Sequence, residues 1–169
     1  MPSNSISKPN WEQTSQNKPL VESFFDQGTS TFTHLVIDPK TDTCAIIDPV
    51  LDFNYSSGQC RYTSADKLIA LIQEKGLTLE WIIETHIHAD HLSPAVYIRK
   101  QLGGSVIIGQ AVCQVQETFG KIFNEDERFH RDGSQFDVLL SDLDSYKVGS
   151  IEAYVLHTPG HTPACMTHI

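Results

Sequence analysis

The spacing of apolar and polar positions predicts strands at the start of the folded part of the chain. Apolar-rich runs at 21–26, 32–38 and 44–48 are separated by short polar turns, which is typical of an antiparallel meander. Polar and turn-forming residues then fill 49–62. We expect a loop there, and its length indicates a functional one, because connections in compact domains are usually shorter.

The middle of the chain predicts helices that alternate with buried strands. Apolar residues recur at helical spacing over 65–75, with Ser64 as the expected N-cap and Gly76 just past the end. A short apolar run at 80–85 predicts a buried strand, and Ser93-Pro94 opens a second helix that ends near Leu102.

The remaining pattern predicts a strand at 105–109, a helix at 111–123, a mixed and loop-like stretch at 129–144, a hairpin of 146–148 with 151–156, and a last strand from Cys165. Strands, then alternating strands and helices, then strands again indicate a layered α/β fold.

Composition narrows the class of protein. The 169 residues suffice for one domain, which we place at 20–169 after a polar arm at 1–19 that we expect to lack stable structure. The formal charge of −9 argues against nucleic acid as a partner, and no apolar run is long enough to span a membrane. The cysteines form no CxxC pair, so we expect neither a disulfide framework nor a structural zinc site, and a cytoplasmic location is the default.

Candidate metal ligands gather where the predicted strand at 80–85 ends. His86, His88, Asp90 and His91 fall within six positions. In extended backbone, side chains two positions apart point to the same side, so His86 and His88 could grip one ion. A single histidine is more often a packing residue than a ligand, but four such side chains together favour a metal site for Zn²⁺ or Fe²⁺.

A second histidine pair follows the predicted hairpin. His157 and His161 bracket Thr-Pro-Gly, where Gly160 would permit a tight or positive-φ turn. Alone this motif is a moderate signal. Together with the first cluster it is a strong one, because a metal site draws its ligands from separated segments.

The two motifs resemble those of the metallo-β-lactamase superfamily. Thr85 to His91 is similar to its HxHxDH motif, and His157 to Cys165 is similar to its next ligand motif, in which the histidine after Thr-Pro-Gly binds the metal. The resemblance implies His86, His88, Asp90, His91 and His161 as metal-site residues, and a packing or supporting role for His157. It also implies an αββα sandwich, of which the chain would hold the first half and the start of the second.

Several further stretches resemble the persulfide dioxygenase and glyoxalase II-like branch, namely 25–31, 46–53, 115–124 and 131–137. The resemblance implies that a Gly-Asp segment with a carboxylate ligand, and a later histidine, follow in family members. Neither is present up to Ile169. We therefore expect a shortened domain, whose open sheet edge would favour association, with a homodimer as a candidate assembly.

The branch implies oxidation of glutathione persulfide to sulfite with O₂ at one Fe²⁺. In that scheme His86, His161 and the carboxylate hold the iron. His88, Asp90 and His91 support the ligands or handle protons, with His88 and Asp90 as the catalytic groups. The substrate would be a small thiol or persulfide of the glutathione type. Asp48 and Asp52 are expected to cap loops or to support the ligands.

Two alternatives stay open at this point. A glyoxalase II-like hydrolase would hold one Zn²⁺ with His86, His88 and His161 and a second with Asp90 and His91, and it would activate a bridging water. Alternatively, the chain is an inactive metal-binding fragment whose ligand set is incomplete. The spacing of the motifs does not separate these three interpretations.

Overall fold

A computed structural model describes residues 18–126 and 128–169. Most of the expected polar arm at 1–19 therefore lies outside the described residues. Strand β1 (Leu20–Asp26) pairs antiparallel with β2 (Thr31–Asp38), and β2 pairs antiparallel with β3 (Thr43–Ile47). The predicted meander is confirmed.

The long segment after β3 contains structure that the sequence did not predict. Strands β4 (Asp52–Asn54) and β5 (Gln59–Arg61) form a small hairpin within the expected loop. Helix α1 (Thr63–Glu74) then begins one residue before the expected cap, Ser64. The reason is that Asp52 supplies the acceptor: its carboxylate binds the backbone N–H of Ser64 at 2.8 Å and the hydroxyl at 2.6 Å. Asp52 therefore has the capping role expected for it.

The parallel part of the fold follows the predicted alternation. Its elements are β6 (Thr78–Glu84), α2 (Ala95–Leu102), β7 (Ser105–Gly109), α3 (Val112–Ile122) and β8 (Val138–Leu140). Strand β8 lies in the stretch predicted to be loop-like, and it forms because Leu140 is buried and the strand pairs with β7. The sheet has the order β1-β2-β3-β6-β7-β8 and is parallel from β3 onward.

A second, antiparallel sheet has the order β11-β10-β9. It consists of β9 (Ser145–Val148), β10 (Ile151–His157) and β11 (Met166–His168), so the predicted hairpin and last strand are both confirmed.

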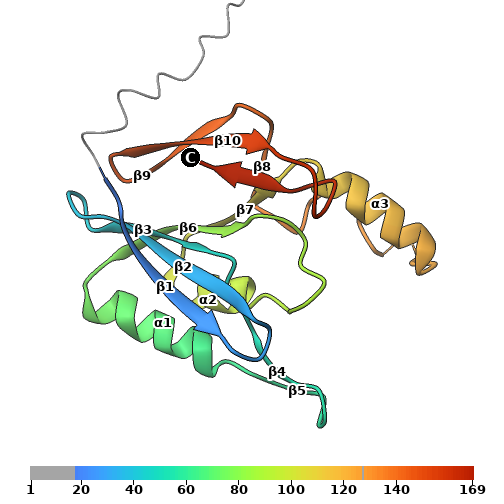
Figure 1. Cartoon of the computed structure of the whole chain (residues 1–169), viewed down its shortest axis with the longest axis horizontal. Helices are drawn as coiled ribbons and strands as arrows, with labels where there is room; N and C mark the ends of the chain where they lie inside the picture. Colours follow the sequence, from blue (N-terminus) through green and yellow to red (C-terminus); the bar gives the residue numbers. More distant parts are fainter. Residues whose placement is uncertain (1–17, 127) are drawn as a thin grey trace, which may run out of the picture.

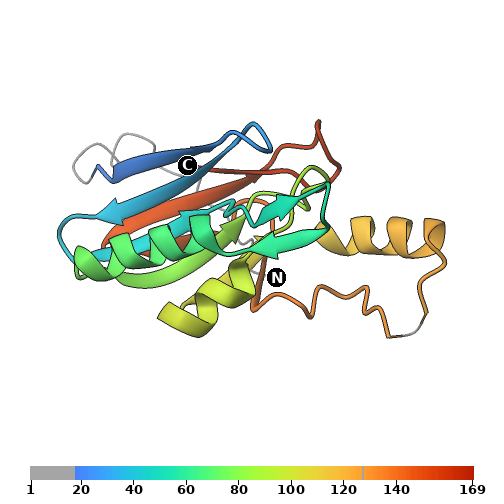
Figure 2. The same ribbon diagram turned by 90° about the horizontal axis from the view of Figure 1, so that it is seen from below.

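The elements form three layers. Figures 1 and 2 show α1 and α2 against one face of the large sheet and the small sheet against the other, while α3 extends away to one side. One apolar core lies between the helices and the large sheet and includes Leu68, Ile72 and Ile82. The other lies between the sheets and includes Ile83, Val155 and Met166. These are three layers of the expected αββα sandwich.

Two smaller expectations concern the surroundings of the protein. No helix in the described part is both long enough and apolar enough to pass through a lipid bilayer. The sequence predicted no disulfide framework. The four cysteines are free thiols in the structure, namely Cys44, Cys60, Cys113 and Cys165.

Candidate metal centre

The candidate centre lies at the carboxyl ends of two neighbouring parallel strands. Ile47 of β3 pairs with Ile83 of β6, so Asp48 and Glu84 come to the same edge of the sheet. The backbone N–H of Asp48 donates to the carbonyl of Ile83 at 2.9 Å. The carboxyl ends of parallel strands are the usual place for binding sites in α/β folds.

Asp48 holds the beginning of the loop that carries the first histidine motif, residues 85–93 between β6 and α2, which we call the histidine loop. Its carboxylate accepts the backbone N–H of Thr85 at 2.8 Å and the Thr85 hydroxyl at 2.7 Å, and it lies 3.0 Å from Nε2 of His88. Burial alone would raise the pKa of Asp48, but the bonds from His88 and Thr85 outweigh it and lower that pKa. The expected supporting role of this carboxylate is seen directly.

His88 lies between carboxylates on both sides of its ring. Nε2 faces Asp48 at 3.0 Å and Glu84 at 3.5 Å, whereas Nδ1 is 3.9 Å from Asp90. Burial would lower the pKa of His88, but its contacts with Asp48 and Glu84 prevail and raise it to about 9. A carboxylate on Nε2 leaves Nδ1 to face the cavity, which is the arrangement of many metal-bound histidines.

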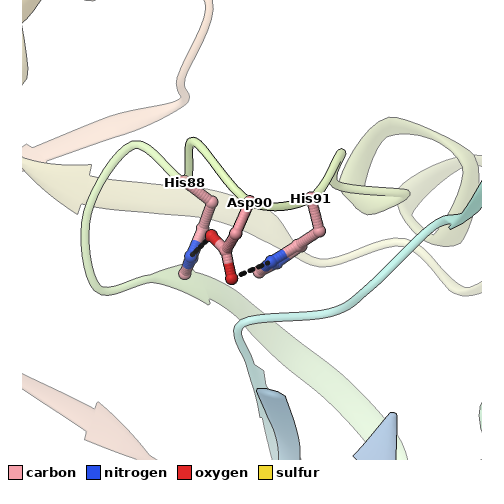
Figure 3. Close-up of side chains that lie close together, drawn as sticks. All are labelled: His88, Asp90 and His91. Carbon is pink, nitrogen blue, oxygen red and sulfur yellow. Dashed lines mark ion pairs between the residues drawn. The ribbon is translucent and has the colours of Figure 1, made fainter. Parts of the chain in front are cut away.

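His88, Asp90 and His91 form a compact group of potential ligands. Figure 3 shows the Asp90 carboxylate between the two imidazole rings. One ligand atom from each residue lies within 4.8 Å of the others, and Asp90 is 3.4 Å from Nδ1 of His91. This geometry suits a shared cation.

The state of His91 shows that a metal ion fits here. The residue is 8% exposed, and within the described part of the chain neither ring nitrogen has a hydrogen-bond partner. An unpartnered buried polar group costs about 1–3 kcal/mol, so native structures rarely leave one without a bound group. An imidazole next to a carboxylate is a donor set for Zn²⁺ or Fe²⁺.

His86 and His161 come together from segments 75 positions apart. Their rings are perpendicular with centroids 4.9 Å apart, and the His86 ring is also 4.1 Å from that of His88. The second motif is held in place because the N–H of Met166 donates to the carbonyl of Thr85 at 3.1 Å. The structure therefore joins the two sequence motifs, while the ligand roles of the five predicted residues stay a prediction.

His157 does not join this cluster. Its Nε2 is bonded to the carbonyl of Pro163 at 2.8 Å, so the ring belongs to its own loop. Of the two turns that Gly160 would permit, tight or positive-φ, the positive-φ one is not used, since the described glycines with positive φ do not include it. The turn is instead held by Thr162, whose N–H and hydroxyl contact Cys165 Sγ at 3.2 and 3.1 Å.

A cleft of about 470 Å³ opens beside the candidate ligands. Its lining includes Thr29, Phe53, Tyr55, His88, Asp90 and His91. Tyr55 reaches over from the β4–β5 hairpin, and its hydroxyl donates to the carbonyl of Asp90 at 3.3 Å. A larger cavity of about 590 Å³ lies between the two sheets. The smaller cleft is the better substrate site, because its lining includes three of the five predicted metal-site residues, His88, Asp90 and His91.

Sequence reasoning missed three residues of this centre: Tyr55, Glu84 and Ser93. Tyr55 and Ser93 carry no local signal, because only the folded chain brings them to the metal centre. Glu84 had a weak local signal, since it is a single charged residue directly after the apolar run Trp81-Ile82-Ile83. A second potential metal group consists of Asp48, Glu84 and His88. Its carboxylates already accept protein donors from Thr85 and Ser93.

Comparison with known proteins gives consistent results. The sequence profile of the metallo-β-lactamase superfamily matches residues 27–167. A probable metallo-hydrolase of Burkholderia pseudomallei is 49% identical over 149 residues, which are 88% of this chain and 51% of that protein. The human mitochondrial persulfide dioxygenase ETHE1 is 29% identical over 150 residues, which are 89% of this chain and 47% of that protein.

The fold agrees with a solved structure as well. The crystal structure of ETHE1 from Myxococcus xanthus superposes with a TM-score of 0.67 at 25% identity, covering 89% of this chain and 53% of that one. The chain thus spans about half the length of the relatives that it matches. The superfamily and the names of these relatives indicate a metal-dependent enzyme. On its sequence profile, its layered fold and its two histidine motifs, the chain belongs to the metallo-β-lactamase superfamily.

Proposed function

We propose that this chain carries the metal site of a persulfide dioxygenase, which oxidises glutathione persulfide to sulfite with O₂ at a single Fe²⁺. The observation that carries the proposal is the pairing of His86 with His161 across two segments, at a ring distance of 4.9 Å. Two histidines with one carboxylate are the usual iron-binding face of oxygenases, and His86 and His161 are the two histidines that this chain supplies. The similarity to two proteins named ETHE1, one of them a persulfide dioxygenase, supports the same choice.

The residues around this pair divide the work. His86 and His161 would hold the iron, which when bound supplies the redox chemistry that lets O₂ react with sulfur. Asp90 is the proton-handling group, because its side chain is 47% exposed and can exchange protons with water. His88 keeps Asp90 in place from the buried side, 3.9 Å away.

The cleft suits a small sulfur substrate. Phe53 and Tyr55 form an edge-to-face pair with ring centroids 5.0 Å apart. They supply an apolar wall of the cleft that His88 and His91 also line. In the proposed reaction one O₂ oxidises the outer sulfur of the persulfide, and one water supplies the third oxygen atom of sulfite. Glutathione and two protons are released, and Asp90 passes the protons to solvent.

The test is oxygen uptake by the iron-loaded protein after addition of glutathione persulfide. We expect uptake with sulfite formed in equal amount and iron near one equivalent per chain. His86→Ala and His161→Ala should abolish uptake, whereas the matched control His157→Ala should retain it because that ring bonds its own loop. Absence of uptake by the iron-loaded wild type would contradict the proposal.

A zinc-dependent hydrolase of the glyoxalase II type is the second candidate. It is favoured by Asp90 and His91, 3.4 Å apart, which could hold a second ion beside the one at His86, His88 and His161, and by the relative named a probable metallo-hydrolase. Two zinc ions per chain together with thioester hydrolysis would select this function. Neither reaction with any metal would leave an inactive metal-binding fragment.

A further inference from the structure

Glu84 is a buried carboxyl group that the proposed reaction does not use. It ends the apolar strand β6 and is 4% exposed. Burial of a carboxyl group is costly unless partners compensate for it. Its contacts therefore indicate why this position, at the border of the metal centre, carries an acid.

Glu84 contacts two residues of the histidine loop. The hydroxyl of Ser93 donates to Oε1, and the same Ser93 oxygen accepts the N–H of Ala95 at 3.1 Å, at the start of α2. Oε2 has no hydrogen-bond partner in the described part of the chain and faces Nε2 of His88 at 3.5 Å.

The loop is thus held at three points by two carboxylates. Asp48 binds Thr85 at its beginning, Glu84 binds Ser93 at its end, and both face the same nitrogen of His88 in the middle. Nε2 therefore faces two acceptors, and Nδ1 lies on the side of Asp90, 3.9 Å from its carboxylate.

We propose that Glu84 is a positioning residue of the metal centre: it fixes the orientation of the His88 ring beside Asp90, and it ties that orientation to the start of helix α2 through Ser93. The inference rests on the metal site of the proposed function and is independent of which reaction the site performs.

The test uses Co²⁺ alone as the probe, because its visible absorption bands report the number and geometry of its ligands. We expect the wild type to bind Co²⁺ with a defined spectrum. Glu84→Ala should bind about 10–100-fold more weakly and with shifted bands, which is the usual effect of removing a group that supports a metal ligand. Glu84→Gln should restore most of the affinity and the spectrum, since its side chain keeps the length needed to contact both Ser93 and His88.

The control is Glu74→Ala, an exposed glutamate at the end of α1. It should leave the affinity and the bands unchanged. If Glu84→Ala does not fold, Glu84→Asp replaces it, because the shorter side chain cannot contact both His88 and Ser93, and the same loss is expected. Wild-type affinity and bands in the folded Ala or Asp variant would overturn the inference alone. Absence of Co²⁺ binding by the wild type would overturn the metal site as well.

Discussion

The carboxylate of Asp38 accepts the backbone N–H of Ser150 at 2.6 Å and the Ser150 hydroxyl at 2.7 Å, although the two residues are 112 positions apart. Asp38 ends β2 and has no exposed surface, and it also binds Lys40 N–H at 3.0 Å and the Thr41 hydroxyl at 2.8 Å. One buried carboxylate thereby joins the turn between β9 and β10 to the end of strand β2 in the large sheet.

Removing this carboxylate should loosen the small sheet. We expect Asp38→Ala to lower the free energy of unfolding by about 3 kcal/mol, because donors from three residues lose a charged acceptor. Urea unfolding followed by circular dichroism measures the change. Glu125→Ala, at an exposed glutamate, is the control and should have no effect. A loss below about 0.5 kcal/mol, the range of ordinary surface substitutions, would show that the sheets are held together without Asp38.

The same carboxylate makes stability depend on pH. Burial would raise the pKa of Asp38, but the hydrogen bonds from Ser150, Lys40 and Thr41 prevail and hold it well below its usual range. The unfolded chain therefore takes up a proton first as pH falls. The contribution of Asp38 is complete above the ordinary carboxyl pKa of about 4 and declines below it.

Unfolding free energies of the wild type and Asp38→Asn between pH 7 and pH 2.5 test this. Their difference should be largest at neutral pH and should shrink below about pH 4. A difference that stays constant over this range would mean that the charge of Asp38 does not matter.

Gly149 allows the turn to approach Asp38. It has φ +59°, and an added Cβ would collide with Thr41 Oγ1 and Asp38 Oδ2. We expect Gly149→Ala to cost at least about 1–3 kcal/mol from backbone strain and crowding. Gly160→Ala is the matched control, since nothing lies within 4 Å of its added Cβ. Equal melting temperatures of the two variants would contradict the close approach.

His91 links stability to the metal. Because neither of its buried ring nitrogens has a hydrogen-bond partner among residues 18–126 and 128–169, His91→Leu should stabilise the metal-free protein by about 1–3 kcal/mol. Conversely, saturating Zn²⁺ should raise the melting temperature of the wild type more than that of the variant. Thermal unfolding with and without chelator measures both effects. A metal-free variant less stable than the wild type would show that the His91 ring is better accommodated than its contacts indicate.

Local patterns in the sequence were sufficient for most elements. The stripe Ala65, Leu68, Ile69 and Ile72 is buried in α1 as its spacing predicts. The two histidine motifs also predicted that a metal centre would form from 85–91 and the turn near His161. These features depend on periodicity and on neighbouring residues, so they can be read along the chain.

Long-range contacts decided what local patterns could not. Ser64 was predicted to cap α1, but Asp52 from the preceding hairpin supplies the acceptor. Strand β8 has only three residues, and pairing with β7 is what makes it a strand. Gly160 would permit a tight or a positive-φ turn, and only the folded chain shows that its φ is not positive and that Thr162 and Cys165 hold the turn.

By itself, then, the sequence determined most of the elements and their order, the superfamily motifs and the candidate metal-binding residues. Only the tertiary structure decided that Asp48 and Glu84 meet at His88, that His86 lies against His161, and that Asp38 receives Ser150. The physical reason is that a side chain's chemistry is local, whereas its partners are set by sheet register and layer packing, which join segments far apart in the chain.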